Sequence, residues 1–186
     1  HRVDRRQRQM CIRDRARLSN LVKGFDVNVL VYSKSLESRQ ADFPDVKNVS
    51  FDELISTSDI ISFHGKAAAD GKPLLSKEHY EKIKPSALII NAARGNIVDE
   101  SDLNDALNEG LIAGAAIDVY STEPAKENVL FSNPKVILTP HIAASTAEAS
   151  IVVAEMAANQ VSDYLLDGTS TVSYTHLRAH ETKANL

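Results

Sequence analysis

Short apolar runs alternate with amphipathic stretches along most of this 186-residue chain, and this alternation constrains the fold more than any other feature. Apolar runs bounded by polar residues, with several β-branched side chains, are typical of buried strands. Such runs occur at 27–32, 59–64, 87–93, 113–120 and 135–140. Helical patterns lie between and after them, at 50–57, 76–85, 99–110 and 145–168. This order predicts the α/β class, with a doubly wound parallel sheet covered by helices on both faces.

Local signals mark the ends of the predicted helices. Two helices open with a capping-box pattern, in which a side-chain oxygen accepts a hydrogen bond from the backbone three residues later. The two pairs are Ser50 with Glu53 and Ser145 with Glu148. The helix at 76–85 should begin at Ser76 and end before Pro85, because a residue that precedes proline avoids helical geometry. Gly110 and Gly168 stand where helices commonly end.

Three polar segments follow three of the predicted strands. They are NAARG (91–95), DVYSTEP (118–124) and TPHIAAST (139–146). Open parallel sheets bind their ligands at the carboxyl ends of the strands, so these segments should border a ligand crevice. They place Arg94, Glu123 and His141 at that edge. Taken singly, these residues could be a surface ion pair, a solvated turn residue and a structural histidine.

Taken together, the three side chains suit one kind of chemistry. An arginine can hold a carboxylate through two parallel hydrogen bonds. A histidine transfers protons near neutral pH, and a neighbouring carboxylate fixes its tautomer. Arg94, Glu123 and His141 therefore predict a site that reduces a 2-keto acid or oxidises a 2-hydroxy acid.

The motifs NAARGNIVDE, GAAIDVYSTEP and LTPHIAASTAEA resemble the D-2-hydroxyacid dehydrogenase family. The resemblance covers about residues 16–170 and is closest to the D-3-phosphoglycerate dehydrogenases, which open serine biosynthesis. It implies a Rossmann-like fold and an oxidoreductase that transfers a hydride between NAD and a D-2-hydroxy acid.

The family resemblance also implies roles for single residues. Arg94 would bind the substrate carboxylate and carbonyl, and His141, paired with Glu123, would exchange a proton with the substrate oxygen. Asp118 would hold the carboxamide of the nicotinamide. The backbone at Ala92 and Ala93, with Arg94, would line the cofactor, and the segment from His141 through Ala143 to Ala144 would lie against the nicotinamide.

The substrate is less constrained than the reaction type. The STAEA run at 145–149 favours 3-phosphoglycerate, which would be oxidised to 3-phosphohydroxypyruvate. Hydroxypyruvate or glyoxylate reductase, D-lactate dehydrogenase and formate dehydrogenase share the resemblance. A binding protein of the same fold, an NAD-sensing transcriptional corepressor, is the alternative from a different class.

The glycine-rich phosphate loop of a dinucleotide fold, G-x-G-x-x-G, does not occur in the sequence. Residues 16–32 resemble the end of the first helix and the second strand of such a fold, so we expect truncation at the first strand and phosphate loop. Ser33 stands where the ribose hydroxyls should bind. With Lys34 beside it, this position leaves NADP open besides NAD. A chain without the loop should have little activity by itself.

Both tails differ from the rest of the chain. RRQRQMCIRDR (5–15) and VSYTHLRAHET (172–182) resemble translated sequencing adapters, so we expect 1–15 and 171–186 to be disordered artefacts around a partial NAD-binding domain at 16–170. The alternative for the first tail is a basic nucleic-acid-binding arm. Since the tails are rich in arginine, the remainder is more acidic than the whole chain, whose net charge is −4. An acidic domain disfavours a nucleic-acid partner.

Other classes of site and location are also disfavoured. No apolar run approaches the roughly 18 residues of a membrane span, and no secretory signal pattern is present. The single cysteine, Cys11, excludes an internal disulfide, and no metal-site spacing occurs. We expect a cytoplasmic enzyme acting on a small molecule, without a metal or a membrane partner, whose full-length form is a homodimer or larger oligomer.

Overall fold

The computed structural model describes residues 18–33, 36, 46–65, 68, 70–143 and 145–168. The two predicted adapter-like tails lie outside the described residues, as do Cys11, Lys34 and Ala144. The described part divides into two units, one up to Ala143 and one from Ala144 onward.

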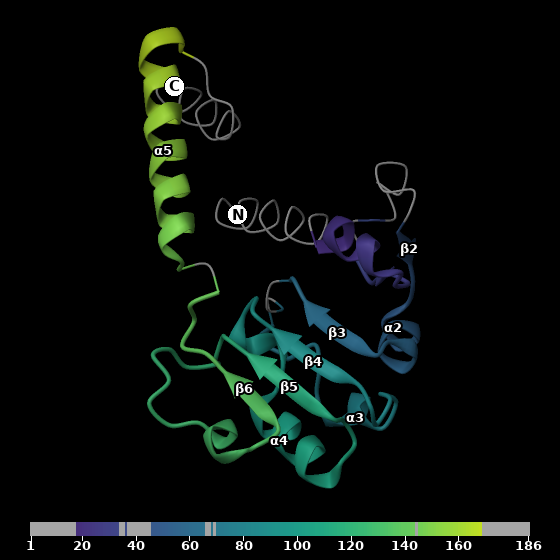
Figure 1. The fold of residues 1–186 in the computed structure, drawn as a ribbon. Helices are drawn as coiled ribbons and strands as arrows, with labels where there is room; N and C mark the ends of the chain where they lie inside the picture. Colours follow the sequence, from purple (N-terminus) through teal and green to yellow (C-terminus); the bar gives the residue numbers. More distant parts are fainter. Residues whose placement is uncertain are drawn as a thin grey trace, which may run out of the picture. The chain divides into compact units, whose positions relative to one another are not determined.

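Four parallel strands form the main sheet of the first unit (Figure 1). They are β3 (Ile60–Phe63), β4 (Leu88–Asn91), β5 (Gly114–Ile117) and β6 (Val136–Leu138), paired in chain order. In the register, Ile61 lies beside Ile89, which lies beside Ala115. The predicted α/β fold with a parallel sheet flanked by helices is confirmed. Because all four strands run the same way, their carboxyl ends meet at one edge.

A second, smaller sheet consists of β1 (Leu30–Val31) and β2 (Lys47–Asn48), which are also parallel. The strand predicted at 27–32 is therefore present but reduced to two paired residues. The polar β2 was not predicted, because Lys47 and Asn48 carry none of the apolar pattern that indicates a strand.

Three helices of the first unit lie within the predicted helical patterns: α2 (Phe51–Thr57), α3 (Lys77–Tyr80) and α4 (Glu100–Glu109). Ser50 caps α2 as predicted, because its hydroxyl accepts the N–H of Glu53 at 3.1 Å. The Glu53 carboxylate accepts a bond from Lys47.

Ser76 is the N-cap of α3, but the prediction that this helix runs up to the residue before Pro85 is wrong. The helix ends at Tyr80, and the following N–H groups of Lys82 and Ile83 bond three residues back, as in tight turns. Gly110 ends α4 at φ 74°, a left-handed conformation that glycine adopts without a side-chain clash.

The core lies between one face of the main sheet and the helices that follow its strands. Alternate strand residues are buried, so Ile61, Ile89 and Ile117 point the same way. They pack in one cluster with Leu103 and Leu107 of α4. The turn η4 (Val129–Ser132) adds the fully buried Leu130. This packing fixes α4 against the buried face of the main sheet.

The second unit contains α5 (Ala147–Asp167), which the pattern at 145–168 predicted. The prediction of Ser145 as its N-cap is wrong by one residue. Thr146 is the N-cap, and its hydroxyl accepts the N–H of Ala149 at 3.0 Å. Both residues can cap a helix, and Thr146 stands three residues before the N–H that it accepts. Gly168 ends α5 in the left-handed region, as expected. No described helix has the combined length and apolar character that a membrane crossing requires.

Candidate active site

The predicted catalytic residues follow β4, β5 and β6, whose ends are in register. Asn91, the last residue of β4, pairs with Ile117 of β5, and Ile117 pairs with Leu138 of β6. The backbone continues this alignment, because Asp118 donates to the Asn91 carbonyl and Thr139 donates to the Ile117 carbonyl, each at 3.0 Å. The three polar segments therefore leave the sheet side by side.

The buried Asn91 side chain shapes the turn that carries Arg94. Its Nδ2 donates to the Arg94 carbonyl at 2.9 Å, and its Oδ1 accepts the N–H of Ala93 at 3.2 Å. Arg94 itself is extended and exposed, and its Nη1 donates to the Ala93 carbonyl at 2.6 Å. Within the described residues, its guanidinium forms no salt bridge. The turn therefore presents a cation that can take an anionic ligand.

Gly95 brings the Arg94 turn against the segment that follows β5. A Cβ atom at Gly95 would lie 1.9 Å from both the carbonyl carbon and oxygen of Tyr120, and 2.4 Å from the nitrogen of Ser121. Glycine is required here because the backbone of Tyr120 and Ser121 occupies that space. The close approach fixes the spacing between the first two polar segments.

Asp118 holds the third segment to the second. Its Oδ1 accepts bonds from the Thr139 hydroxyl and the Ile142 N–H, and its Oδ2 accepts the Ala143 N–H. Burial raises the pKa of this carboxyl, but the hydrogen bonds from Thr139, Ala143 and Ile142, with the nearby His141, outweigh burial and bring the pKa below its usual value. Asp118 is therefore a carboxylate that fixes the loop on either side of His141.

Glu123 and His141 are joined directly. Nδ1 of His141 lies 2.7 Å from Oε2 of Glu123, and the N–H of Tyr120 donates to Oε1 of the same carboxylate at 3.0 Å. The Tyr120 and His141 hydrogen bonds lower the pKa of Glu123, and the charges of His141 and Arg94 act in the same direction. His141 has φ 57° in the left-handed region, which histidine adopts more readily than most residues. Both side chains are partly exposed, so the ring can meet a ligand.

A family model described as D-isomer specific 2-hydroxyacid dehydrogenase, NAD binding domain, matches residues 16–143. The chain belongs to this family. The resemblance drawn from the three motifs is therefore confirmed, and with it the Rossmann-like, NAD-binding-domain character of the fold.

Relatives of this dehydrogenase domain differ in the acids for which they are named. The chain is 40% identical over 140 residues to D-3-phosphoglycerate dehydrogenase of Archaeoglobus fulgidus, which is 75% of this chain and 27% of that protein. It is 39% identical over 139 residues to a probable 2-ketogluconate reductase of Dictyostelium discoideum, with coverages of 74% and 42%. The solved D-2-hydroxyisocaproate dehydrogenase superposes with a TM-score of 0.71 at 28% identity, covering 82% of this chain and 50% of that one. The chain thus spans about a quarter to a half of these relatives.

The predicted cofactor-binding residues of this dehydrogenase domain are only partly brought together. Ala92 and Ala93 lie between Asn91 and Arg94 in the same turn, and the Ala143 N–H donates to Asp118. Ser33 follows β1 of the smaller sheet, where its N–H donates to Oδ1 of Asn48 at 3.2 Å. Ala144 lies outside the described residues. Within the described ranges, no group of three or more potential metal ligands gathers.

Three residues that shape the site were missed from the sequence. Asn91 interrupts an apolar run, and a polar residue in that place is a usable signal. Nothing in the sequence around Gly95 indicates that the backbone of Tyr120 passes close to it. Thr139 was read only as part of a motif, although its hydroxyl bonds to Asp118.

Proposed function

We propose that this domain belongs to an enzyme that oxidises 3-phosphoglycerate to 3-phosphohydroxypyruvate with NAD. The hydrogen bond between His141 and Glu123, beside the exposed Arg94, carries the proposal. The A. fulgidus relative named D-3-phosphoglycerate dehydrogenase supports the choice of acid. A reductase of sugar acids is the second candidate, because the D. discoideum relative is named a probable 2-ketogluconate reductase and is nearly as similar, at 39% identity.

In this proposal His141 is the acid and base. Glu123 accepts a bond from the proton on Nδ1, so the neutral ring presents its Nε2 lone pair to the ligand; this tautomer is assigned from the hydrogen bond. Nε2 takes the proton of the substrate hydroxyl during oxidation and returns it during reduction. The Glu123 carboxylate, whose pKa lies below its usual value, stabilises the charged ring that forms.

Arg94 is the proposed substrate clamp. A guanidinium has five N–H donors, and only the one to the Ala93 carbonyl is engaged within the described residues. The remaining donors can hold the planar carboxylate of a 2-hydroxy acid through two parallel bonds. This hold fixes the hydroxyl-bearing carbon near His141, and orientation of this kind supplies a large part of the rate gain in enzymes.

The residues around Asp118 fit the nicotinamide end of NAD. A carboxylate accepts about four hydrogen bonds, and Asp118 receives three from the described residues, so Oδ2 retains capacity for one carboxamide N–H. Ala92, Ala93 and Ala143 have small side chains, which lets a flat ring approach the backbone. When bound, NAD would supply the hydride acceptor. Ser33 is proposed to contact the ribose, with NADP as the alternative cofactor.

Steady-state kinetics of the full-length protein that carries this domain would test the proposal. Among 3-phosphoglycerate, D-lactate, D-glycerate, glycolate and D-gluconate, kcat/KM should be highest for 3-phosphoglycerate. The variant His141→Ala should lower kcat by roughly 10²–10⁴-fold while NAD binding is unchanged. Arg94→Ala should raise KM for the acid as well as lower kcat.

Lys126→Ala removes an exposed cation three residues after Glu123 and serves as the control for Arg94→Ala. It should leave both kinetic constants unchanged. Unaltered kinetics in Arg94→Ala would refute the clamp, and a preference for D-gluconate would select the sugar-acid reductase instead.

A further inference from the structure

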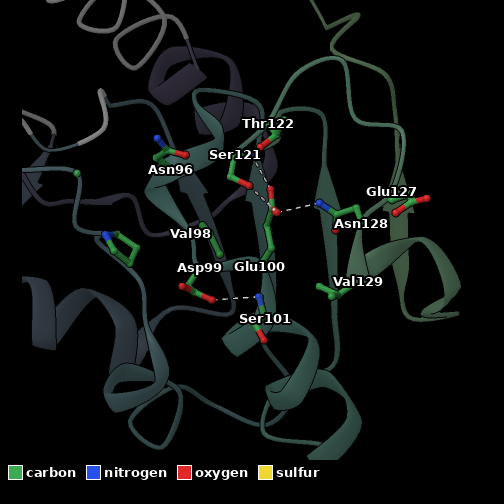
Figure 2. Close-up of a pocket in the computed structure, with 12 residues that line it drawn as sticks. Asn96, Val98, Asp99, Glu100, Ser101, Ser121, Thr122, Glu127, Asn128 and Val129 are labelled. Atoms are coloured by element: carbon green, nitrogen blue, oxygen red, sulfur yellow. Dashed lines mark hydrogen bonds between the residues drawn. The ribbon is translucent and has the colours of Figure 1, made fainter.

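We infer that Glu100, the first residue of α4, is a positioning residue for the proposed acid–base pair, an inference that rests on the proposed function. Its carboxylate accepts three hydrogen bonds. The Ser121 N–H donates to Oε1 at 2.7 Å, while the Ser121 hydroxyl and Nδ2 of Asn128 donate to Oε2 at 2.9 and 2.8 Å. Figure 2 shows the Glu100 side chain reaching between Ser121 on one side and Asn128 on the other.

These bonds close the segment 121–128 at its two ends. Glu123, which bonds to His141, lies within that segment, two residues after Ser121. Within the described residues, every hydrogen bond from 121–128 to α4 ends on the Glu100 carboxylate. Glu100 therefore ties the Glu123 loop to a helix that is packed in the core.

The other end of this connection is rigid. Leu103 and Leu107 of α4 are fully buried, and Asp99 caps the helix by accepting the N–H groups of Ser101 and Asp102 at 3.0 Å. On the loop side, Asn128 also accepts the N–H of Leu130 at 2.9 Å, and Leu130 is fully buried. The helix that carries Glu100 and its partner Asn128 are thus both anchored, so the carboxylate bonds fix the position of Ser121 relative to the core.

The consequence for His141 follows from the chain of contacts. The N–H of Tyr120, the residue before Ser121, donates to the Glu123 carboxylate and orients it, and that carboxylate orients the ring of His141. Without Glu100, the Ser121 N–H loses its acceptor and the segment loses its tie to α4. A displacement of about 1 Å in an orienting group can cost roughly 10²-fold in rate.

Glu100 also lines a pocket of about 430 Å³ that extends to Gly71 and Glu127. Arg94, Glu123 and His141 are not among its lining residues. Ser121 and Asn128 occupy the Glu100 carboxylate with hydrogen bonds. We therefore assign this side chain to holding the loop 121–128 and not to binding a ligand in the pocket.

Imidazole NMR of the ¹⁵N-labelled chain tests the inference without substrate or turnover. The chain has 6 histidines, and the His141→Gln variant identifies the signals of His141. In the parent, the neutral His141 ring should carry its proton on Nδ1. In Glu100→Ala this form should fall from the major to the minor population, because free imidazole rings prefer a proton on Nε2.

Glu100→Gln is the second variant, since an amide keeps one acceptor for the Ser121 N–H. It should produce an intermediate shift of the tautomer population and should fold even where Glu100→Ala does not. Glu109→Gln removes the same charge from the exposed end of the same helix and should leave the His141 signals unchanged. Parent-like His141 signals in folded Glu100→Ala, or in Glu100→Gln where the first variant does not fold, would overturn the inference.

The full-length enzyme supplies a kinetic readout that separates this inference from the proposed function. Glu100→Ala should lower kcat about tenfold to a hundredfold with little change in KM for NAD, and Glu100→Gln should recover part of the loss. If the parent enzyme oxidises no 2-hydroxy acid, the proposed function fails while the NMR result stands. If the parent is active and Glu100→Ala has parent-like kcat, the positioning role fails alone.

Discussion

The contact between Gly95 and the backbone after β5 leads to a sharp prediction. In Gly95→Ala the new methyl group would lie 1.9 Å from two backbone atoms of Tyr120. Ordinary contacts begin near 3.4 Å, so one segment must move by about 1.5 Å. Because a backbone cannot rotate away as a side chain can, we expect the free energy of unfolding to fall by about 3 kcal/mol, the upper part of the range for overpacked sites.

Urea unfolding followed by circular dichroism measures this loss. Gly24→Ala is the matched control, because nothing lies within 4 Å of its added Cβ. The control should be neutral or slightly more stable, by up to about 1 kcal/mol, since alanine restricts the unfolded chain. Equal free energies of unfolding for Gly95→Ala and Gly24→Ala would show that the Tyr120 backbone does not lie in contact with Gly95.

Two further predictions concern Asp118 and the cap of α5. The folded pKa of Asp118 is lowered, so its stabilisation is present above the unfolded value of 3.8 and is lost as the pH falls through the folded value. The difference in unfolding free energy between the parent and Asp118→Asn should therefore shrink in acid, and a constant difference would contradict this. Thr146→Ala should weaken α5 by about 1 kcal/mol, measured by amide hydrogen exchange. Ser145→Ala should have little effect, and the reverse result would restore Ser145 as the cap.

The strands and the polar segments of the candidate site were predictable because their signals are local. Apolar runs end in Asn91, Asp118 and Thr139, and each polar segment then carries a residue of recognisable chemistry. The rule that ligands bind at the carboxyl ends of parallel strands was enough to place Arg94 and His141 at one edge. The motif resemblance supplied the partnership of His141 with Glu123.

What could not be predicted depends on contacts between distant parts of the chain. Glu100 reads as an acid in the first turn of a helix, where it suits the helix dipole. Its three bonds reach 21 and 28 residues along the sequence, and no local pattern marks their ends. β2 was missed for the opposite reason: two polar residues pair with β1 through their backbone alone, and a side-chain pattern does not report that pairing.

Three polar side chains hold the three segments of the site, and each does so by accepting hydrogen bonds from backbone N–H groups. Asn91 accepts from Ala93, Glu100 from Ser121, and Asp118 from Ile142 and Ala143. These N–H groups would otherwise need water or a ligand as acceptor. Since each is already satisfied, the loops have lost their conformational freedom before any ligand arrives, and binding need not supply the free energy of ordering them. Disturbing any one of the three polar side chains should therefore loosen one segment, and the geometry of the candidate site should change even where Arg94, Glu123 and His141 are intact.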